Sequence, residues 1–166
     1  RNYFAKVDGY EGQTKDRQFD GLADLGSALS EALGQSVESL WSMENGYALC
    51  SAGGLQAISE HLELLSQDQV NELAGKLRIG VHLDVEVTDS DASQRPLVSQ
   101  AFCSALPVAY SSIPATKWKS FATLVLQAAY EATLSAAVLN AERGVSNVVF
   151  LTRLGGGAFG NDDDWI

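Results

Sequence analysis

The chain has 166 residues, of which 21 are Asp or Glu and 11 are Lys or Arg, so its formal net charge at pH 7 is −10. This excess of acidic residues argues against an extended nucleic acid or an anionic membrane as the partner, because proteins bind polyanions through clustered cations. Hydrophobic residues make up 46% of the sequence, which is typical of a packed domain with a sizeable core rather than of a disordered acidic tail.

The first predicted elements are a helix and a tight hairpin. From Phe19 to Gly34 apolar residues recur at helical spacing, and the glycine can end the helix. Two short apolar runs, 40–43 and 47–50, then flank Asn45-Gly46. Because an Asn-Gly pair tolerates positive φ, these runs predict two antiparallel strands joined by a short turn.

Two further helices and two strands follow. Ser51 and Ser66 can each cap a helix that carries apolar residues at helical spacing. Residues 78–88 alternate strictly between apolar and other residues, which predicts a strand with one apolar face. A polar loop over 89–96 leads to a second predicted strand, 98–106, which ends at a proline.

The longest helical signal covers residues 116–143 and is apolar nearly all round. Its stretch from 121 to 139 is long enough to span a bilayer, at roughly 20 residues for a ~30 Å hydrocarbon core. Gln127 and Glu131 lie in the middle, where an acidic side chain would cost about 2–3 kcal/mol. We therefore expect a buried, alanine-rich helix packed on a sheet. The continuous apolar run 148–151 then predicts a strand covered on both faces.

This order of helices and strands predicts a single α/β domain over residues 1–166. The chain opens without Met and closes on 162–166, where acidic residues look like the first turn of a helix, so we expect the domain to be incomplete at both ends. Cys50 and Cys103 lie in apolar contexts without zinc-ligand spacing. They predict reduced core thiols and a reducing compartment such as the cytoplasm.

The most informative motif is the glycine-rich segment that follows the run 148–151. Its glycines permit positive φ and close approach to a ligand, and its N–H groups can bind phosphate without a lysine. The spacing matches neither a Walker loop nor the dinucleotide fingerprint, and Asp162–Asp164 would repel an anion unless they face away or hold a cation. The alternative is a tight structural joint. The candidate binding residues are Gly155, Gly156, Gly157, Ala158, Phe159, Gly160 and Asn161.

A long alanine-rich helix, a buried strand and a glycine-rich loop with an aromatic residue before its last glycine resemble the C-terminal part of macro domains, the ADP-ribose-binding family. The resemblance covers about 50 residues, roughly 118–166. It implies a three-layer sandwich with a mixed central sheet flanked by helices. It also implies that Gly157, Ala158, Phe159 and Gly160 wrap a diphosphate through backbone N–H groups, with the aromatic ring beside the distal ribose.

A second constellation lies on the predicted strand 78–88. His82, Asp84 and Glu86 alternate on the face opposite the apolar residues, about 6–7 Å apart, and so could line one cleft. An imidazole and two carboxylates can act as a general acid–base set or bind a divalent cation. The alternative is the solvated face of a half-buried strand. We take these three as the candidate catalytic residues and assign no metal site and no cofactor.

The sequence thus favours binding of ADP-ribose or a related phosphorylated nucleotide, with hydrolase activity left open. The alternative function is a non-catalytic structural or assembly protein that uses the glycine-rich turn and the apolar helix for packing. An open cleft above Gly155–Gly160 would favour the ligand, whereas a loop plugged by side chains or by a partner subunit would favour assembly. The expected partners are a small phosphorylated ligand, no extended nucleic acid and no membrane, with an oligomer or a larger parent assembly compatible with both hypotheses.

Overall fold

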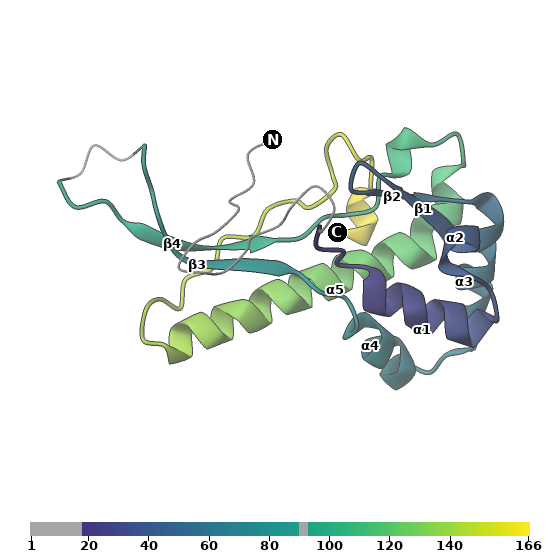
Figure 1. Ribbon diagram of the computed structural model, residues 1–166, viewed down its shortest axis with the longest axis horizontal. Helices are drawn as coiled ribbons and strands as arrows, with labels where there is room; N and C mark the ends of the chain where they lie inside the picture. The colour runs from purple at the N-terminus through teal and green to yellow at the C-terminus, as the bar shows by residue number, and fades with distance from the viewer. Residues whose placement is uncertain (1–17, 90–92) are drawn as a thin grey trace.

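The structure, a computed structural model, describes residues 18–89 and 93–166 and combines helices with two antiparallel two-stranded sheets (Figure 1). The α-helices are α1 (Ala23–Leu33), α2 (Val37–Leu40), α3 (Ala52–Leu64), α4 (Gln67–Ala74) and α5 (Ala115–Glu142). The strands are β1 (Trp41–Glu44), β2 (Tyr47–Cys50), β3 (Gly80–Glu86) and β4 (Leu97–Phe102), and the 3₁₀ helices are η1 (Val108–Tyr110) and η2 (Asp163–Trp165). The predicted α/β class is therefore confirmed as a mixture of helices and strands.

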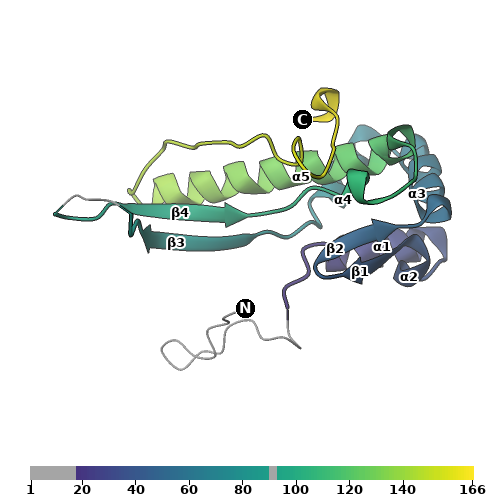
Figure 2. The ribbon, with the colours of Figure 1, turned by 90° about the horizontal axis from the view of Figure 1, so that it is seen from above.

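The molecule is elongated, and α5 runs along most of its length, with the β3–β4 hairpin projecting beyond the end of the helix (Figure 2). At one end α1, α2, α3 and α4 and the β1–β2 hairpin pack around the first half of α5, and at the other the β3–β4 hairpin lies along its second half. Trp41 stacks on Phe121 in the core, with ring centroids 5.4 Å apart. The large, fully buried side chains that belong to the same core cluster are Leu25, Leu29, Leu40, Leu55, Ile58, Leu106, Trp118 and Val125.

The predicted turns and caps of this end are confirmed. Gly34 ends α1 with a left-handed φ of 62°, and the turn between β1 and β2 has φ of 52° at Asn45 and 85° at Gly46. The Ser51 hydroxyl accepts a hydrogen bond from Gly54 N at 2.8 Å, and Ser66 forms a full capping box at the start of α4. These turns and helix caps depend on contacts between residues three or four positions apart, which is why the sequence alone indicates them.

The β3–β4 hairpin differs from its prediction. Its strands are shorter than 78–88 and 98–106, and the chain leaves the ladder after Phe102. Residues 90–92 of the predicted connecting loop lie outside the described residues. The register jumps between the pairs His82–Gln100 and Val85–Val98, and Asp84 has a φ of 55°. The chain advances by three residues on β3, from 82 to 85, but by only two on β4, from 100 to 98, so β3 contains one extra residue that forms a bulge. The predicted strict alternation along β3 is therefore wrong.

Only the first half of α5 is the buried helix that the sequence predicts. Trp118, Phe121 and Ala129 are buried, whereas Val138 and Leu139 are more than half exposed. By length and composition α5 could cross a membrane, with a mean hydropathy of 1.3 over an 18-residue window of which 33% is buried. Its second half contacts the hairpin on one side and leaves apolar side chains exposed on another.

The segment after α5 is extended but belongs to no strand of the described residues. The prediction of a buried strand over 148–151 is wrong, because all four side chains are exposed and that of Phe150 is 90% exposed. A continuous apolar run predicts a strand covered on both faces, yet pairing also requires a neighbouring strand, and the pattern does not show which one. The segment therefore presents both apolar side chains and unpaired backbone.

The two cysteines are free thiols in different environments. Burial raises the pKa of the Cys50 thiol to about 12, whereas Cys103 is half-buried, with its Sγ 3.9 Å from Thr133 Oγ1. Because the thiolate is the reactive form, we expect one thiol of the native protein to react with a disulfide reagent at pH 8 and the second only in denaturant. Absorbance of the released thiolate measures this, and Cys103→Ser is expected to remove the native-state reaction. Reaction of both thiols at one rate in the folded protein would contradict it.

Candidate functional site

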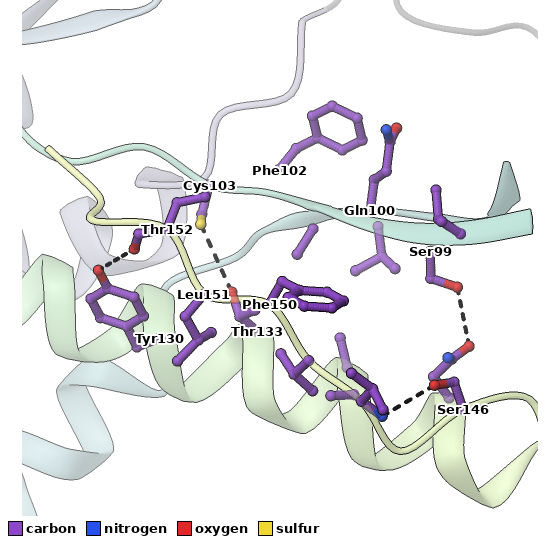
Figure 3. Close-up of a pocket in the computed structure, with 18 of the residues that line it drawn as sticks. Ser99, Gln100, Phe102, Cys103, Tyr130, Thr133, Ser146, Phe150, Leu151 and Thr152 are labelled. Atoms are coloured by element: carbon purple, nitrogen blue, oxygen red, sulfur yellow. Dashed lines mark hydrogen bonds between the residues drawn. The ribbon is translucent and has the colours of Figure 1, made fainter. Parts of the chain in front are cut away.

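The candidate loop, residues 154–161, connects the extended segment to η2 and packs on residues 105–110 (Figure 2). A tyrosine of α5 fixes its start. The Tyr130 hydroxyl donates to Thr152 O at 2.7 Å (Figure 3) and also accepts from Leu154 N at 3.0 Å. One side chain thus holds the backbone on both sides of Arg153 and sets the direction in which the loop leaves.

The inner side of the loop requires glycine at two positions. Gly155 has a φ of +78°, and a Cβ atom there would collide with Ala105 Cβ and lie 2.7 Å from Asn161 Nδ2. Gly160 has a φ of +67°, and its Cβ atom would lie 2.8 Å from Ala109 Cβ. These two glycines therefore permit turns that other residues rarely adopt and let the loop backbone lie directly on residues 105–109.

Asn161 anchors the other end of the loop. Its side chain is 4% exposed, and its Nδ2 donates to Leu106 O at 2.9 Å and to Gly155 O at 3.3 Å. Its backbone N also donates to Gly155 O, at 3.0 Å, which closes the loop into a ring. Its Oδ1 is buried and has no hydrogen-bond partner among the described residues. Asn161 therefore positions the loop through donors rather than through an acceptor.

The outer side of the loop offers free donors. Gly160 N donates to Gly157 O at 3.0 Å, which forms a turn around Ala158 and Phe159. The backbone N–H groups of Gly157, Ala158 and Phe159 have no acceptor in the part of the chain that the structure describes. Gly157 and Ala158 are exposed, and a Cβ atom at Gly157 would meet nothing within 4 Å. Three successive N–H groups are thus available to an acceptor from solvent.

An aromatic cluster packs against this turn through the side chain of Phe159. The ring of Phe159 meets those of Tyr47 and Tyr110 edge to face, at centroid distances of 5.7 and 5.6 Å, and the two tyrosines are 5.3 Å apart. Phe159 O also accepts from Ala109 N at 2.9 Å. Sequence reasoning named Phe159 as a candidate but did not predict that its ring meets those of Tyr47 and Tyr110, because nothing in the spacing of these positions joins them.

Sequence reasoning also missed a cation at the loop. Arg153 forms an ion pair with Asp163, and its aliphatic part and Nε lie against Gly156. Asp162 accepts a hydrogen bond from Asp164 N at 2.9 Å, which caps η2 where a longer helix was predicted. Two of the three carboxylates that would repel an anion therefore have partners, a guanidinium and a backbone N–H.

The candidate catalytic residues are not brought together. His82 pairs with Gln100 of β4 and Glu86 with Leu97, and positions 97 and 100 face opposite sides of β4, so His82 and Glu86 point to opposite faces. The expectation that all three share one face is wrong, because the bulge inverts the alternation. Asp84 is ion-paired with Arg143 and Glu86 with Arg95 at 2.7 Å, while the His82 ring meets Phe102 at 4.8 Å.

All three of these side chains are exposed. Within residues 18–89 and 93–166 no group of three or more His, Cys, Asp and Glu side chains is placed to hold a metal ion. The arrangement is that of two surface ion pairs and one ring contact. It does not form an acid–base set around a common reacting atom.

Two cavities lie beside the loop rather than above it. One of about 490 Å³ separates β4 from the extended segment over α5 (Figure 3), and Leu154 is one of its lining residues. Another of about 300 Å³ is bounded by residues 19–22, by the β1–β2 hairpin and by residues 102–107. The loop itself is packed on its inner side, as expected for a structural joint, and open on its outer side, as expected for a ligand site. It therefore agrees in part with both hypotheses drawn from the sequence.

Comparison of the chain with models of protein families, with curated proteins and with solved structures found no match.

Proposed function

We propose that the loop 154–161 binds a phosphorylated nucleotide of the ADP-ribose type, with phosphate oxygens on the N–H groups of Gly157, Ala158 and Phe159. The observation that carries the proposal is that these three successive donors lie on a turn with an exposed outer side and have no acceptor among the described residues, whereas the N–H groups of Gly160 and Asn161 that follow them are bonded within the loop. Consecutive peptide N–H groups that converge on one side of a turn are a common way of binding anions.

The electrostatics of the loop allow an anion despite the net charge of −10. A hydrogen bond to a charged group contributes about 1.5–3 kcal/mol. Repulsion from distant carboxylates is screened over about 8 Å at physiological ionic strength. Arg153 lies against Gly156 and is ion-paired with Asp163, and a phosphate could share its guanidinium with that carboxylate.

The proposal also includes a macro-like fold and a reducing cellular compartment. A strand pairing by residues 148–151 over α5 would give the sheet layer of a macro-like sandwich, with α5 as one helical layer. The free Cys50 and Cys103 suit a reducing compartment such as the cytoplasm. We propose binding and no catalytic step, because His82, Asp84 and Glu86 do not surround one point.

A proline at position 158 tests the proposal at a single N–H group. Ala158 is the second residue of the turn closed by Gly157 and Gly160, a position where proline is favoured, so Ala158→Pro removes a donor without breaking a hydrogen bond of the protein. We expect calorimetry to show ADP-ribose binding by the parent protein and at least about tenfold weaker binding by this variant. Ala158→Ser keeps the N–H and is the matched control.

Two results would count against the proposal. If the folded parent protein gives no heat with millimolar ADP-ribose, the loop does not bind this class of ligand. If Ala158→Pro binds as tightly as Ala158→Ser, the N–H group of residue 158 is not a phosphate donor. Ribose 5-phosphate and AMP, titrated in parallel, show which part of the nucleotide is recognised.

A further inference from the structure

The cavity of about 490 Å³ has a shape and chemistry that differ from those of the loop site. We call it the slot. Its two walls are β4 and the extended segment 145–152, and its floor is the second half of α5, including Thr133, Ala136 and Ala137 (Figure 3). None of its lining residues is charged, although 19% of the chain is. The slot is therefore an uncharged surface in an acidic protein.

Both walls present unpaired peptide groups. On one side, the five successive N–H groups of residues 149–153 have no acceptor among the described residues, and in an extended segment alternate N–H groups point toward the same edge. On the other side β4 pairs with β3 alone, so its second edge has no ladder partner in the described part of the chain. Peptide groups next to an apolar floor are costly to leave without hydrogen bonds, and an open strand edge readily pairs with another chain.

The direction of the walls selects the kind of occupant. β4 and the extended segment run the same way along α5, on either side of the slot (Figure 2). A strand between them would form hydrogen bonds with both edges and would place alternate side chains on the apolar floor. A helix or an acyl chain would cover the floor but would leave both rows of peptide groups unpaired.

We propose that the slot receives an extended segment of a partner protein, which adds a strand between β4 and residues 148–151. Charge favours a partner over a second copy of this chain, because at contact distance between two proteins the screening that shields the loop from remote carboxylates is incomplete. Two copies would each bring a net charge of −10 to the interface, whereas a basic partner would be attracted to this chain. The partner's segment that enters the slot is uncharged and rich in β-branched residues, and basic residues of the partner flank it on both sides. The inference does not depend on the loop binding a nucleotide.

A labelled peptide tests the proposal directly. The probe has three Thr-Val repeats between two pairs of lysines and carries a fluorophore, and its binding is followed by anisotropy. Two control peptides are N-methylated, one on its three threonines and the other on its three valines. Because successive N–H groups of a strand point to opposite edges, each control loses the donors to one wall.

Insertion between two edges predicts that each methylated peptide binds at least about tenfold more weakly than the probe. Addition to only one wall would weaken only one of them, and simple apolar binding would weaken neither, so both of these results overturn the proposal. Absence of binding by the unmethylated probe at about 1 mM overturns it as well.

Variants of α5 locate the binding. Ala137→Trp fills the floor of the slot and is expected to reduce probe binding at least about tenfold, while Ser135→Trp, on an exposed position outside the slot, is expected to leave it unchanged. Equal binding by both variants would place the probe elsewhere. Sedimentation of the protein alone tests the second copy: a dimer that the probe does not dissociate overturns the choice of partner.

Discussion

Gly54→Ala is expected to lower the free energy of unfolding by about 3 kcal/mol or more, whereas Gly53→Ala, one residue earlier in α3, is expected to raise it by up to about 1 kcal/mol. The two glycines occupy the same first turn of the helix, so their helix propensities cancel in the comparison. The opposite signs come entirely from what a methyl group would meet.

At Gly54 the methyl group would meet backbone. It would overlap Leu40 O and lie 2.6 Å from Leu40 Cα and 2.8 Å from Leu40 C, so no side-chain rotation could relieve the collision. Relief would require α3 to move away from the α2–β1 junction and the Ser51 cap to be disturbed. At Gly53 no atom of the described residues would lie within 4 Å of the added methyl group, so only the gain in helix propensity is left.

Urea unfolding followed by tryptophan fluorescence measures both effects, because Trp41 and Trp118 are buried in the core that α3 completes. Gly34→Ala provides a third reference, since its φ of +62° makes alanine strained even though no atom is close. If Gly53→Ala and Gly54→Ala change the unfolding midpoint alike, α3 does not approach Leu40 as closely as the structure shows.

Local signals account for most of what the sequence predicted correctly. The Asn45-Gly46 turn and the caps at Ser51 and Ser66 all depend on neighbours within a few residues. Ser51-Ala52-Gly53-Gly54 could be identified as a helix start, but the sequence could not show that the second glycine alone touches Leu40. That contact joins residues 14 positions apart and depends on how two elements pack.

The failures have a common physical cause. A strand is defined by its partner, and neither the apolar run 148–151 nor the alternation along β3 specifies one. The bulge at Asp84 adds one residue, and one residue is enough to move Glu86 to the face opposite His82. The prediction of a catalytic set at His82, Asp84 and Glu86 is therefore wrong because the sequence pattern does not show the bulge that changes the direction of the side chains.

The candidate loop was found from its glycines, yet its anchors were not. Asn161 reaches Leu106, 55 positions away, and Phe159 accepts from Ala109, 50 positions away. Side-chain amides and carbonyl groups occur throughout any sequence, so only the structure shows which of them meet. The consequence is that the residue most important for the loop's shape is a buried asparagine at its end rather than an exposed glycine.

Asn161→Asp is expected to destabilise the protein by about 3 kcal/mol at pH 7 and to abolish the proposed binding of ADP-ribose. The change preserves shape but replaces an NH₂ group that donates to Leu106 O and Gly155 O with a carboxylate oxygen that repels both. Asn71→Asp is the matched control, since Asn71 is exposed and its Oδ1 accepts from Gln67 Nε2, a role that a carboxylate keeps.

The pH dependence of this variant gives the sharper test. Burial and two facing carbonyl groups raise the pKa of the introduced carboxyl in the folded state above its unfolded value. The destabilisation is therefore largest above the folded pKa and is relieved as the pH falls through it, where the protonated carboxyl can donate one hydrogen bond. Urea titrations from pH 7 to pH 5 are expected to bring the variant closer to the parent protein, whereas Asn71→Asp should follow the parent throughout. A constant difference between variant and parent over this range would show that the side chain at position 161 does not face carbonyl groups in a dry site.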